Sequence, residues 1–363
     1  MRELELIDGP VRWDGAVAVE ATGDGVQPWR LPPDDRALHH PALVAAARCP
    51  SGVRLRWRSD TRSVAIAVEA RDLPGHEGYE LPIPLDLVVD DDLVASRTAG
   101  PGAGRYRVAF DDLPPGVHDL ELWLPPAPAV RVRAVEVDAA AHDEPPPPDL
   151  RPRWVVYGSS ITQGSGLRPT RTWPALVARR RGWHLVNLGY TGQCHLDPLV
   201  ARLVAALPAD RVTAELGINI HNFATLRERT FAPAVHGLLA AIRDGHPGVP
   251  VTVLSPVVSP DRETTAKSVL ETPTWRREYE GDLTLVAMRE ALRRVVDVRR
   301  AAGDVHLHHV DGLDVLGWAD TGLLPDGLHP NAAGHRVMAE RYVAATAPLS
   351  PLSSRGPLST PRR

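Results

Sequence analysis

The residues of this sequence best suited to chemistry are two adjacent serines, Ser159 and Ser160, which follow an apolar run at 154–157. Much later in the chain, Asp326 and His329 lie in the turn-forming stretch 323–331. A serine hydroxyl becomes a useful nucleophile when a histidine takes its proton, and a carboxylate can fix the tautomer of that histidine. Because Asp326 and His329 are three residues apart in a turn, these residue types predict acyl transfer through a serine ester.

Two further polar stretches could stabilise the oxyanion that such a reaction forms. Gly192 lies in the glycine-containing stretch 189–193, and Asn219 lies in 217–221. Backbone N–H groups and a carboxamide can donate to a developing oxyanion, and losing one such donor costs about 3 kcal/mol of transition-state stabilisation. From the residues alone, both could equally be turn residues, and a serine after a strand often only caps a helix. The spacing does not choose between Ser159 and Ser160.

The elements that must position these stretches alternate between strands and helices in the second half of the chain. Apolar runs predict strands at 154–158, 184–189, 211–217, 249–256 and 304–310. Helical spacing between and after them predicts helices at 172–182, 196–208, 229–245, 283–303 and 329–347. This alternation predicts an α/β fold with a doubly wound parallel five-stranded sheet. Ligands bind beyond the carboxyl ends of such strands, which is where the polar stretches lie.

The first part of the chain has a different pattern. Short alternating runs predict strands at 51–60, 63–71, 81–96, 105–110, 116–124 and 129–137. Glycine, proline and aspartate separate these runs, which is typical of an all-β sandwich or jelly roll.

Four consecutive prolines then mark a domain boundary. We therefore expect a β-sandwich accessory domain at 1–140, a Pro-rich linker at 141–153, a catalytic domain at 154–347 and a disordered tail at 348–363.

The four polar stretches resemble, in order, the four sequence blocks of the SGNH/GDSL hydrolase family. They read GSSITQG at 158–164, NLGYTG at 187–192, ELGIN at 215–219 and DGLHP at 326–330. The resemblance covers about 154–345 and implies the flavodoxin-like SGNH fold. Two positions depart from the family pattern, because Ser159 stands where aspartate is common and Ile220 follows Asn219 where aspartate is often found.

The resemblance also implies roles for individual residues. It makes Ser160 the nucleophile and His329 the general base, oriented by Asp326. The oxyanion would be held by the backbone amides of Ser160 and Gly192 and by the side chain of Asn219. Ser159 is then expected to cap the following helix.

The function that follows is a serine hydrolase of the SGNH/GDSL type that cleaves an ester and needs no cofactor. An alternative is an acyltransferase that moves an acyl group from a thioester or ester donor to an alcohol of a natural-product or sugar acceptor. A non-catalytic carbohydrate-binding protein is a third possibility. The layout of the two domains resembles that of some carbohydrate esterases, so tryptophans of the first domain could stack on sugars or pack in its core. These are Trp13, Trp29, Trp57 and Trp123.

Other residues carry weaker expectations. His195 and His221 follow the second and third blocks and are weak candidates for contacting substrate. The polar, non-periodic segment 257–282 is expected to be a lid that walls the acyl or acceptor pocket. Histidines at 306, 308 and 309 raise the alternative of a metal site, but they lack acidic or cysteine partners at ligand spacing, so no metal is expected.

Composition limits the partners and the compartment. The net charge is −4 and no long basic stretch occurs, which argues against nucleic acid. The two cysteines, Cys49 and Cys194, are predicted to lie in different domains, so no disulfide is expected. No apolar run is long enough to span a bilayer and the N-terminus has no apolar signal segment, which predicts a cytoplasmic protein with no membrane contact. The sequence leaves the oligomeric state open.

Overall fold

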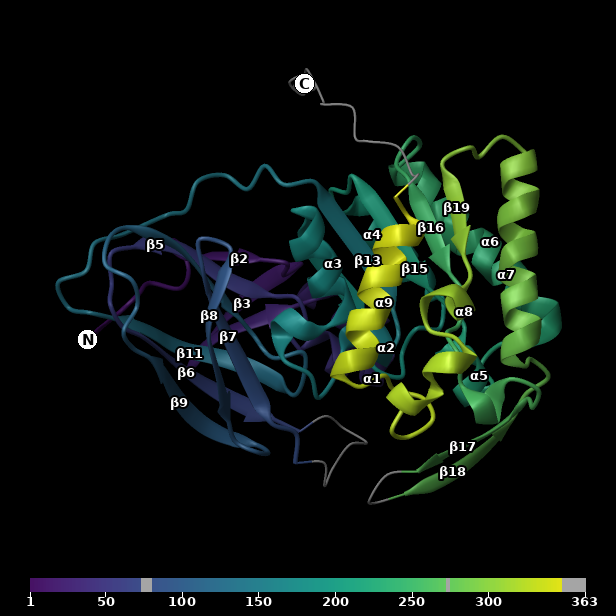
Figure 1. Ribbon diagram of the computed structural model, residues 1–363, viewed down its shortest axis with the longest axis horizontal. Coiled ribbons are helices and arrows are strands. Elements are labelled where there is room, and N and C mark those ends of the chain that lie inside the picture. The colour runs from purple at the N-terminus through teal and green to yellow at the C-terminus, as the bar shows by residue number, and fades with distance from the viewer. Residues whose placement is uncertain (73–79, 272–274, 348–363) are drawn as a thin grey trace.

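Two parts of the chain stand side by side in the structure, a computed structural model that describes residues 1–72, 80–271 and 275–347 (Figure 1). The N-terminal part, purple to blue in the figure, is built of strands. The C-terminal part, teal to yellow, has a sheet with helices on both sides. The predicted disordered tail at 348–363 lies outside the described residues.

The N-terminal part is a sandwich of two antiparallel sheets, as the alternating sequence predicts. One sheet has the order β3 (Ala18–Thr22), β4 (Gly25–Trp29), β11 (Ala129–Val137), β6 (Val64–Arg71), β9 (Gly104–Phe110), with β1 (Arg2–Glu3) beside β11. The other has the order β12 (Asp143–Glu144), β5 (Arg54–Ser59), β10 (His118–Trp123), β7 (Ile83–Val89), β8 (Asp92–Ala99), with β2 (Arg12–Asp14) beside β5. Alternate residues such as Leu55, Trp57, Ile66 and Val68 fill the core between the sheets.

Several elements of this part were not predicted. The strands β1 to β4 all precede the first predicted strand at 51–60. A helix, α1 (Pro41–Ala47), interrupts the strands after the 3₁₀ turn η1 (Pro33–Leu38), and its run of alanine and leucine has high helix propensity. The short strand β12 lies inside the predicted linker and pairs with β5 at the sheet edge. The strand ends after two residues, where the proline run begins, because proline cannot donate to a sheet.

The C-terminal part contains the predicted parallel five-stranded sheet. Its order is β14 (His184–Gly189), β13 (Arg153–Gly158), β15 (Arg211–Glu215), β16 (Val251–Leu254), β19 (Leu307–Val310). All four neighbouring pairs are parallel. The first strand in sequence, β13, therefore lies between the second and the third, which is the doubly wound arrangement.

Helices cover both faces of this sheet, as the helical periodicity of the sequence requires. Val155 and Tyr157 of β13 pack in the cluster formed with α4 (Pro198–Ala206), α6 (Glu228–Gly245) and α7 (Leu285–Ala301). Trp154 and Val156 point the other way, into the cluster formed with α3 (Trp173–Arg181) and α9 (Ala332–Ala345). Shorter helices follow the strands: α2 (Ser160–Gln163), η2 (Pro169–Arg171), α5 (Ile218–Phe223), α8 (Gly312–Val315) and η4 (Trp318–Leu323).

The predicted lid segment, 257–282, has more regular structure than its sequence suggests. It begins with the 3₁₀ turn η3 (Pro260–Arg262) and continues as an antiparallel hairpin of β17 (Lys267–Glu271) and β18 (Arg276–Glu280). The hairpin projects from the body of the molecule beside α5 (Figure 1). Within the described ranges, no helix is both long and apolar enough to cross a membrane.

The two parts share hydrophobic cores. Trp29 and Leu31 of the sandwich pack in the cluster that includes Tyr157 and Tyr190, and Trp123 packs with Trp154. Of the tryptophans that could have stacked on sugars, Trp29, Trp57 and Trp123 are buried. Trp13 is half-buried and donates from Nε1 to the Leu6 carbonyl. Core packing therefore accounts for these tryptophans.

Candidate active site

The sheet brings three of the four polar stretches together. Because β14, β13 and β15 are neighbours, the segments that follow them lie side by side at the carboxyl edge. These segments carry Gly192, Ser160 and Asn219 respectively. The fourth stretch, with Asp326 and His329, follows α8 and η4 after the edge strand β19.

Ser160, His329 and Asp326 form one hydrogen-bonded chain. Ser160 Oγ lies 2.8 Å from His329 Nε2, and His329 Nδ1 lies 2.7 Å from Asp326 Oδ2. Asp326 Oδ1 also accepts from the backbone N–H groups of Leu328 and His329, at 3.0 and 2.7 Å. Although burial opposes ionisation, these hydrogen bonds and the nearby His329 hold the pKa of Asp326 well below its usual range. The ionised Asp326 places the proton of neutral His329 on Nδ1, so that Nε2 faces Ser160 as an acceptor.

The turn after β13 separates the two serines, as the sequence predicts. Ser159 is fully buried and its Oγ accepts from the Ile161 backbone N–H at 3.1 Å, which makes it the N-cap of α2. Ser160 is the first residue of that helix, so its own N–H lies outside the hydrogen bonds of the helix. The side chain of Ser160 reaches His329, whereas that of Ser159 points into the protein.

A buried carboxylate, which the sequence reasoning missed, lies behind this turn. Glu215 Oε2 accepts from Ser159 N at 2.8 Å, from Ser159 Oγ at 2.7 Å and from Thr162 Oγ1 at 3.2 Å. Burial raises the pKa of Glu215 in spite of these donors. Gly158 allows the close approach, because a Cβ there would lie 2.7 Å from Glu215 Oε2 and 2.5 Å from Thr162 Oγ1. An acidic residue at the end of a mostly buried strand was the available sequence signal.

The turn after β14 presents the backbone of Gly192. A hydrogen bond from Gln193 N to the Tyr190 carbonyl closes the turn, and Gly192 has a φ of +69°, which favours glycine. Thr191 N donates to Gln163 Oε1 at 2.9 Å, which ties this turn to the end of α2. The Gly192 N–H lies outside the bond that closes the turn and so remains a candidate oxyanion donor.

Asn219 lies in α5, a helix too short for its periodicity to be recognised in the sequence. Its Oδ1 accepts from the Cys194 backbone N–H at 3.0 Å, which leaves Nδ2 as the end of the amide that can donate to an oxyanion. Cys194 itself is fully buried, and burial raises the pKa of its thiol well above the ordinary value. This cysteine is therefore a packed side chain and not a reactive thiolate.

His195, one of the two weak candidates, lies beside the Gly192 turn with both ring nitrogens engaged. Its Nε2 lies 2.9 Å from the Gly192 carbonyl and its Nδ1 lies 3.0 Å from Thr225 Oγ1. Burial lowers the pKa of His195, and the carbonyl requires a proton on Nε2. Phe223 packs edge-on against this ring and Tyr279 of β18 packs against Phe223. The imidazole thus holds the Gly192 peptide in place.

His221, the other weak candidate, is buried and turned toward the lid segment. Its Nε2 lies 2.9 Å from the Thr265 carbonyl, which precedes the hairpin. The structure therefore gives both histidines defined neighbours but does not show either as a free group facing a substrate.

A second residue missed from the sequence comes from the sandwich. The Arg30 side chain is fully buried and donates to neutral oxygens only. Its acceptors are the carbonyls of Ala46, Cys49, Asn187 and Gly189 and the side chain of Gln163. Gln163 Oε1 is the same atom that accepts from Thr191, so Arg30 supports the Gly192 turn from the other domain. A single arginine just after a sandwich strand gave no sequence signal for this contact.

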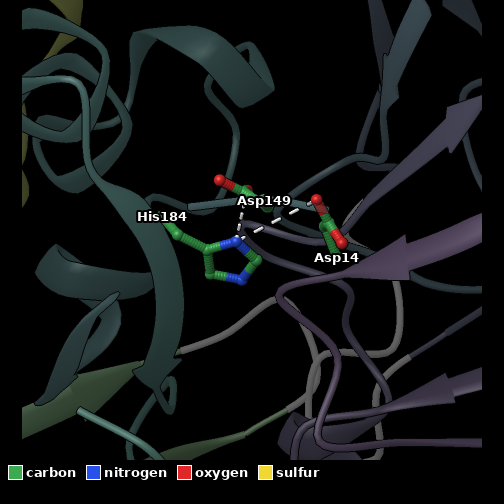
Figure 2. A group of neighbouring side chains, drawn as sticks. All are labelled: Asp14, Asp149 and His184. Atoms are coloured by element: carbon green, nitrogen blue, oxygen red, sulfur yellow. Dashed lines mark hydrogen bonds and ion pairs between the residues drawn. The ribbon is translucent and has the colours of Figure 1, made fainter. Parts of the chain in front are cut away.

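A second cluster of titratable residues joins the two domains away from the serine. Figure 2 shows His184 of β14 between Asp149 and Asp14, with Nδ1 at 2.7 and 4.0 Å from the carboxylate oxygens. Among the described residues, this is the group whose ligand atoms lie close enough to hold a metal ion. Its carboxylates already have cationic partners, however. These are Arg54, Arg56 and Arg151.

The charges of this cluster decide its role. Three guanidinium groups face Asp14, Asp149 and Glu121, so the cluster is balanced without a further cation. A divalent metal ion would add charge beside the arginines, which opposes its binding. We therefore describe the cluster as an ion-pair network between the domains. His306, His308 and His309 are not part of it.

Comparison with known proteins agrees with the geometry. A GDSL-like lipase/acylhydrolase family model matches residues 156–337, and the model of the SsfX3 N-terminal domain matches 11–131. Among solved structures, the salicylyl-acyltransferase SsfX3 from a tetracycline biosynthetic pathway is 32% identical, with a TM-score of 0.84 over 98% of this chain and 99% of that chain.

Other solved structures share the fold at lower identity. A putative GDSL-like lipase from Bacteroides ovatus is 19% identical, with a TM-score of 0.74 over 94% of this chain and 96% of that one. A family two carbohydrate esterase from Clostridium thermocellum is 15% identical, with a TM-score of 0.63 over 93% and 98%. No curated protein matches the chain. With its four blocks at one sheet edge and matches that cover both domains, this chain belongs to the GDSL-like lipase/acylhydrolase family.

Proposed function

We propose that the protein cleaves an ester through an acyl-enzyme formed on Ser160. Ser160 Oγ attacks the carbonyl carbon while His329 Nε2 takes the hydroxyl proton, and the alcohol leaves with that proton. A water molecule then attacks the acyl carbon and gives a proton to His329, after which the acid leaves and Ser160 regains its proton. The N–H groups of Ser160 and Gly192 and the amide of Asn219 stabilise the oxyanion of both steps.

The observation that carries this proposal is the unbroken chain from Ser160 Oγ through His329 to Asp326. The side chains of His329 and Asp326 are 46% and 55% exposed, so water has access to the general base. Access of water favours hydrolysis as the fate of the acyl-enzyme.

Acyl transfer to an alcohol is the second candidate, and the similarity to SsfX3 favours it. That protein is a salicylyl-acyltransferase, and the likeness extends over both domains of this chain. The acyl-enzyme on Ser160 would be the same, but in the second step a hydroxyl of a small-molecule acceptor would attack the acyl carbon in place of water. The burial of the sandwich tryptophans gives no support to a non-catalytic sugar-binding protein.

One experiment separates the two fates. The protein is incubated with aryl esters and acyl thioesters, with and without alcohol acceptors, and the products are identified by mass spectrometry. We expect free acid from the esters. An acceptor ester formed in preference to free acid would instead assign the protein to acyl transfer.

The nucleophile is tested in the same assay. Ser160→Ala is expected to lower kcat by about a thousandfold or more, because no other described group can form the acyl-enzyme. A fluorophosphonate probe should label Ser160 in the wild-type protein and in Ser159→Ala, and should not label Ser160→Ala. Unchanged turnover in Ser160→Ala, or a probe adduct on Ser159, would show that the proposed mechanism is wrong.

A further inference from the structure

We propose that Arg262 is an anion-binding residue of this site, and that the preferred substrate carries a carboxylate or phosphate on its acyl or leaving group. The inference rests on the proposed ester cleavage at Ser160. It concerns only which esters are preferred, so the two can fail separately.

Arg262 lies between the two sides of the site. Its Nε donates to Asn222 Oδ1 at 2.8 Å, and Asn222 is one helical turn after Asn219 in α5. Its Nη1 donates to Ser259 Oγ at 3.1 Å. Ser259 in turn donates to the carbonyl of Gly327, the neighbour of Asp326, at 2.7 Å. The guanidinium therefore bridges the helix of the oxyanion donor and the turn of the triad acid.

The charge of Arg262 is not balanced by a carboxylate. Among the described residues, none lies within 4.0 Å of its guanidinium nitrogens, and both of its hydrogen-bond partners are neutral. Asp326 is close enough to act on it electrostatically, but the Asp326 oxygens are already occupied by His329 and the Leu328 N–H. Asp261, its neighbour in sequence, also acts on it electrostatically, but its side chain is exposed and makes no ion pair with Arg262, so solvent screens that interaction. A half-buried cation without a counterion is costly unless an anion binds it.

The neighbouring residue shows the contrast. Glu263 is buried, and both of its carboxylate oxygens accept from Arg289 of α7 at 2.6 Å. The chain thus pairs one guanidinium of this region with a carboxylate and leaves the guanidinium nearer to the triad without one. The Glu263–Arg289 ion pair already attaches the segment around Arg262 to α7.

One nitrogen of Arg262 remains available for a ligand. Nε and Nη1 hold the side chain in place, whereas Nη2 has no hydrogen-bond partner among the described residues and is not among the solvent-inaccessible polar atoms. A planar guanidinium fixed at two nitrogens is preorganised to donate to a carboxylate or phosphate oxygen. Because Arg262 is linked through Ser259 to the turn that carries Asp326, we expect such an anion to belong to the same substrate as the scissile ester.

Two matched pairs of esters test the proposal and locate the anion. On the acyl side, 4-nitrophenyl succinate is compared with its neutral methyl ester, and on the leaving-group side, 3-carboxy-4-nitrophenyl acetate is compared with 4-nitrophenyl acetate. We expect the wild-type protein to prefer the anionic member of one pair in kcat/KM. Raising the ionic strength should reduce that preference.

Arg262→Gln should lower kcat/KM for the preferred anionic ester by about ten- to a hundredfold, the range for a hydrogen bond to a charged group. Turnover of the neutral partner should fall much less than turnover of the anionic ester, and Arg262→Lys should restore part of the preference. Arg293→Gln is the matched control, because Arg293 is exposed on α7 and removing it changes the net charge equally.

Three results would overturn the inference while leaving ester cleavage intact. In the first, the wild-type protein shows no preference for the anionic ester in either pair. In the second, Arg262→Gln lowers kcat/KM equally for the anionic and the neutral ester. In the third, Arg293→Gln reduces the preference for the anionic ester as strongly as Arg262→Gln does. If Arg262→Gln fails to fold, the inference is tested by the preference of the wild-type protein for the anionic ester and by the change of that preference in Arg262→Lys. No turnover of any ester would instead contradict the proposed function.

Discussion

At the scale of single residues, the distinctive feature is the position of the carboxylate behind the proposed nucleophile. The family pattern commonly has aspartate at the position of Ser159, and the chain has Glu215 on the neighbouring strand instead. Ser159 donates to that carboxylate with both its N–H and its hydroxyl. The turn at Ser159 is thus held by a carboxylate that reaches it from β15.

Restoring the common residue should therefore destabilise this protein. Ser159→Asp would still cap α2 but would place a second carboxylate within hydrogen-bond distance of Glu215. We expect a loss of about 2 kcal/mol in the free energy of unfolding, with most of the loss recovered in the double variant with Glu215→Gln. Thermal unfolding of the four proteins measures this coupling, and additive effects would contradict it.

The same substitution has a predictable pH dependence. Folding raises the pKa of Glu215, so the folded state binds more protons and stability falls as the pH rises through the raised pKa. A second carboxylate raises that pKa further. The difference in melting temperature between Ser159→Asp and the wild type should therefore be larger at pH 8 than at pH 5.

What the sequence predicted at this scale follows from how local each signal is. Asp326 and His329 are three residues apart, so their types and spacing were enough to predict that they interact, whereas the choice of Ser160 over Ser159 came from the resemblance to the family block. Glu215, Arg30 and Arg262 act across strands, domains or loops. Their roles depend on which segments are neighbours in space, and a single sequence does not contain that information.

At the scale of elements, long periodic segments were predicted well and short ones were not. The five strands of the parallel sheet and the helices α3, α4, α6, α7 and α9 all form where apolar periodicity indicates. Helix α5 has six residues, too few for a period to show. The hairpin β17–β18 is polar over most of its length and most of its side chains are exposed, so its strands lack the usual alternation of apolar and polar residues.

The hairpin can be removed cleanly, because its ends already meet. Gly281 N donates to the Ala266 carbonyl at 3.0 Å, so residues 267–280 can be replaced by two glycines. Tyr279 would be lost from its contact with Phe223, which packs beside His195 and the Gly192 turn. The buried Glu263–Arg289 pair would stay.

We expect this deletion to leave the fold and the turnover of 4-nitrophenyl acetate largely intact while changing the preference among larger acyl or alcohol groups. The reason is that the hairpin lies beside the site but supplies none of the proposed catalytic groups. The kcat/KM values for an acyl-chain series and an alcohol series measure the effect, and circular dichroism checks the fold. An unchanged preference in both series would show that the segment is not a lid.

At the scale of the whole molecule, two buried arginines of the sandwich contact opposite ends of the same catalytic strand. Arg30 donates to the carbonyls of Asn187 and Gly189 at the carboxyl end of β14, where the site lies. Arg54 donates to the carbonyl of Leu185, near the other end of β14. Arg30 and Arg54 therefore make two similar contacts between the domains, of which only the Arg30 contact lies beside the proposed active site.

Replacing each arginine by methionine should separate stability from catalysis. Each variant leaves several buried acceptors unpaired, so each should lose about 3 kcal/mol of unfolding free energy. Only Arg30→Met should also lower kcat per folded molecule, by about tenfold, because the Gln163–Thr191 contact that supports Gly192 loses its partner. Active-site titration gives the folded fraction, and an equal fall in kcat for both variants would contradict this role of Arg30.

Because residues of both domains share hydrophobic clusters, the order in which the chain is synthesised affects how the sandwich folds. The sandwich leaves the ribosome first, but Trp29, Leu31 and Leu43 pack in a cluster most of whose members lie on strands and helices that are synthesised later. Until β13 and β14 emerge, the nascent sandwich carries an uncovered apolar face. The order of synthesis therefore makes the N-terminal domain dependent on its successor, and a truncated transcript that encodes the sandwich alone would produce an aggregation-prone fragment rather than a finished domain.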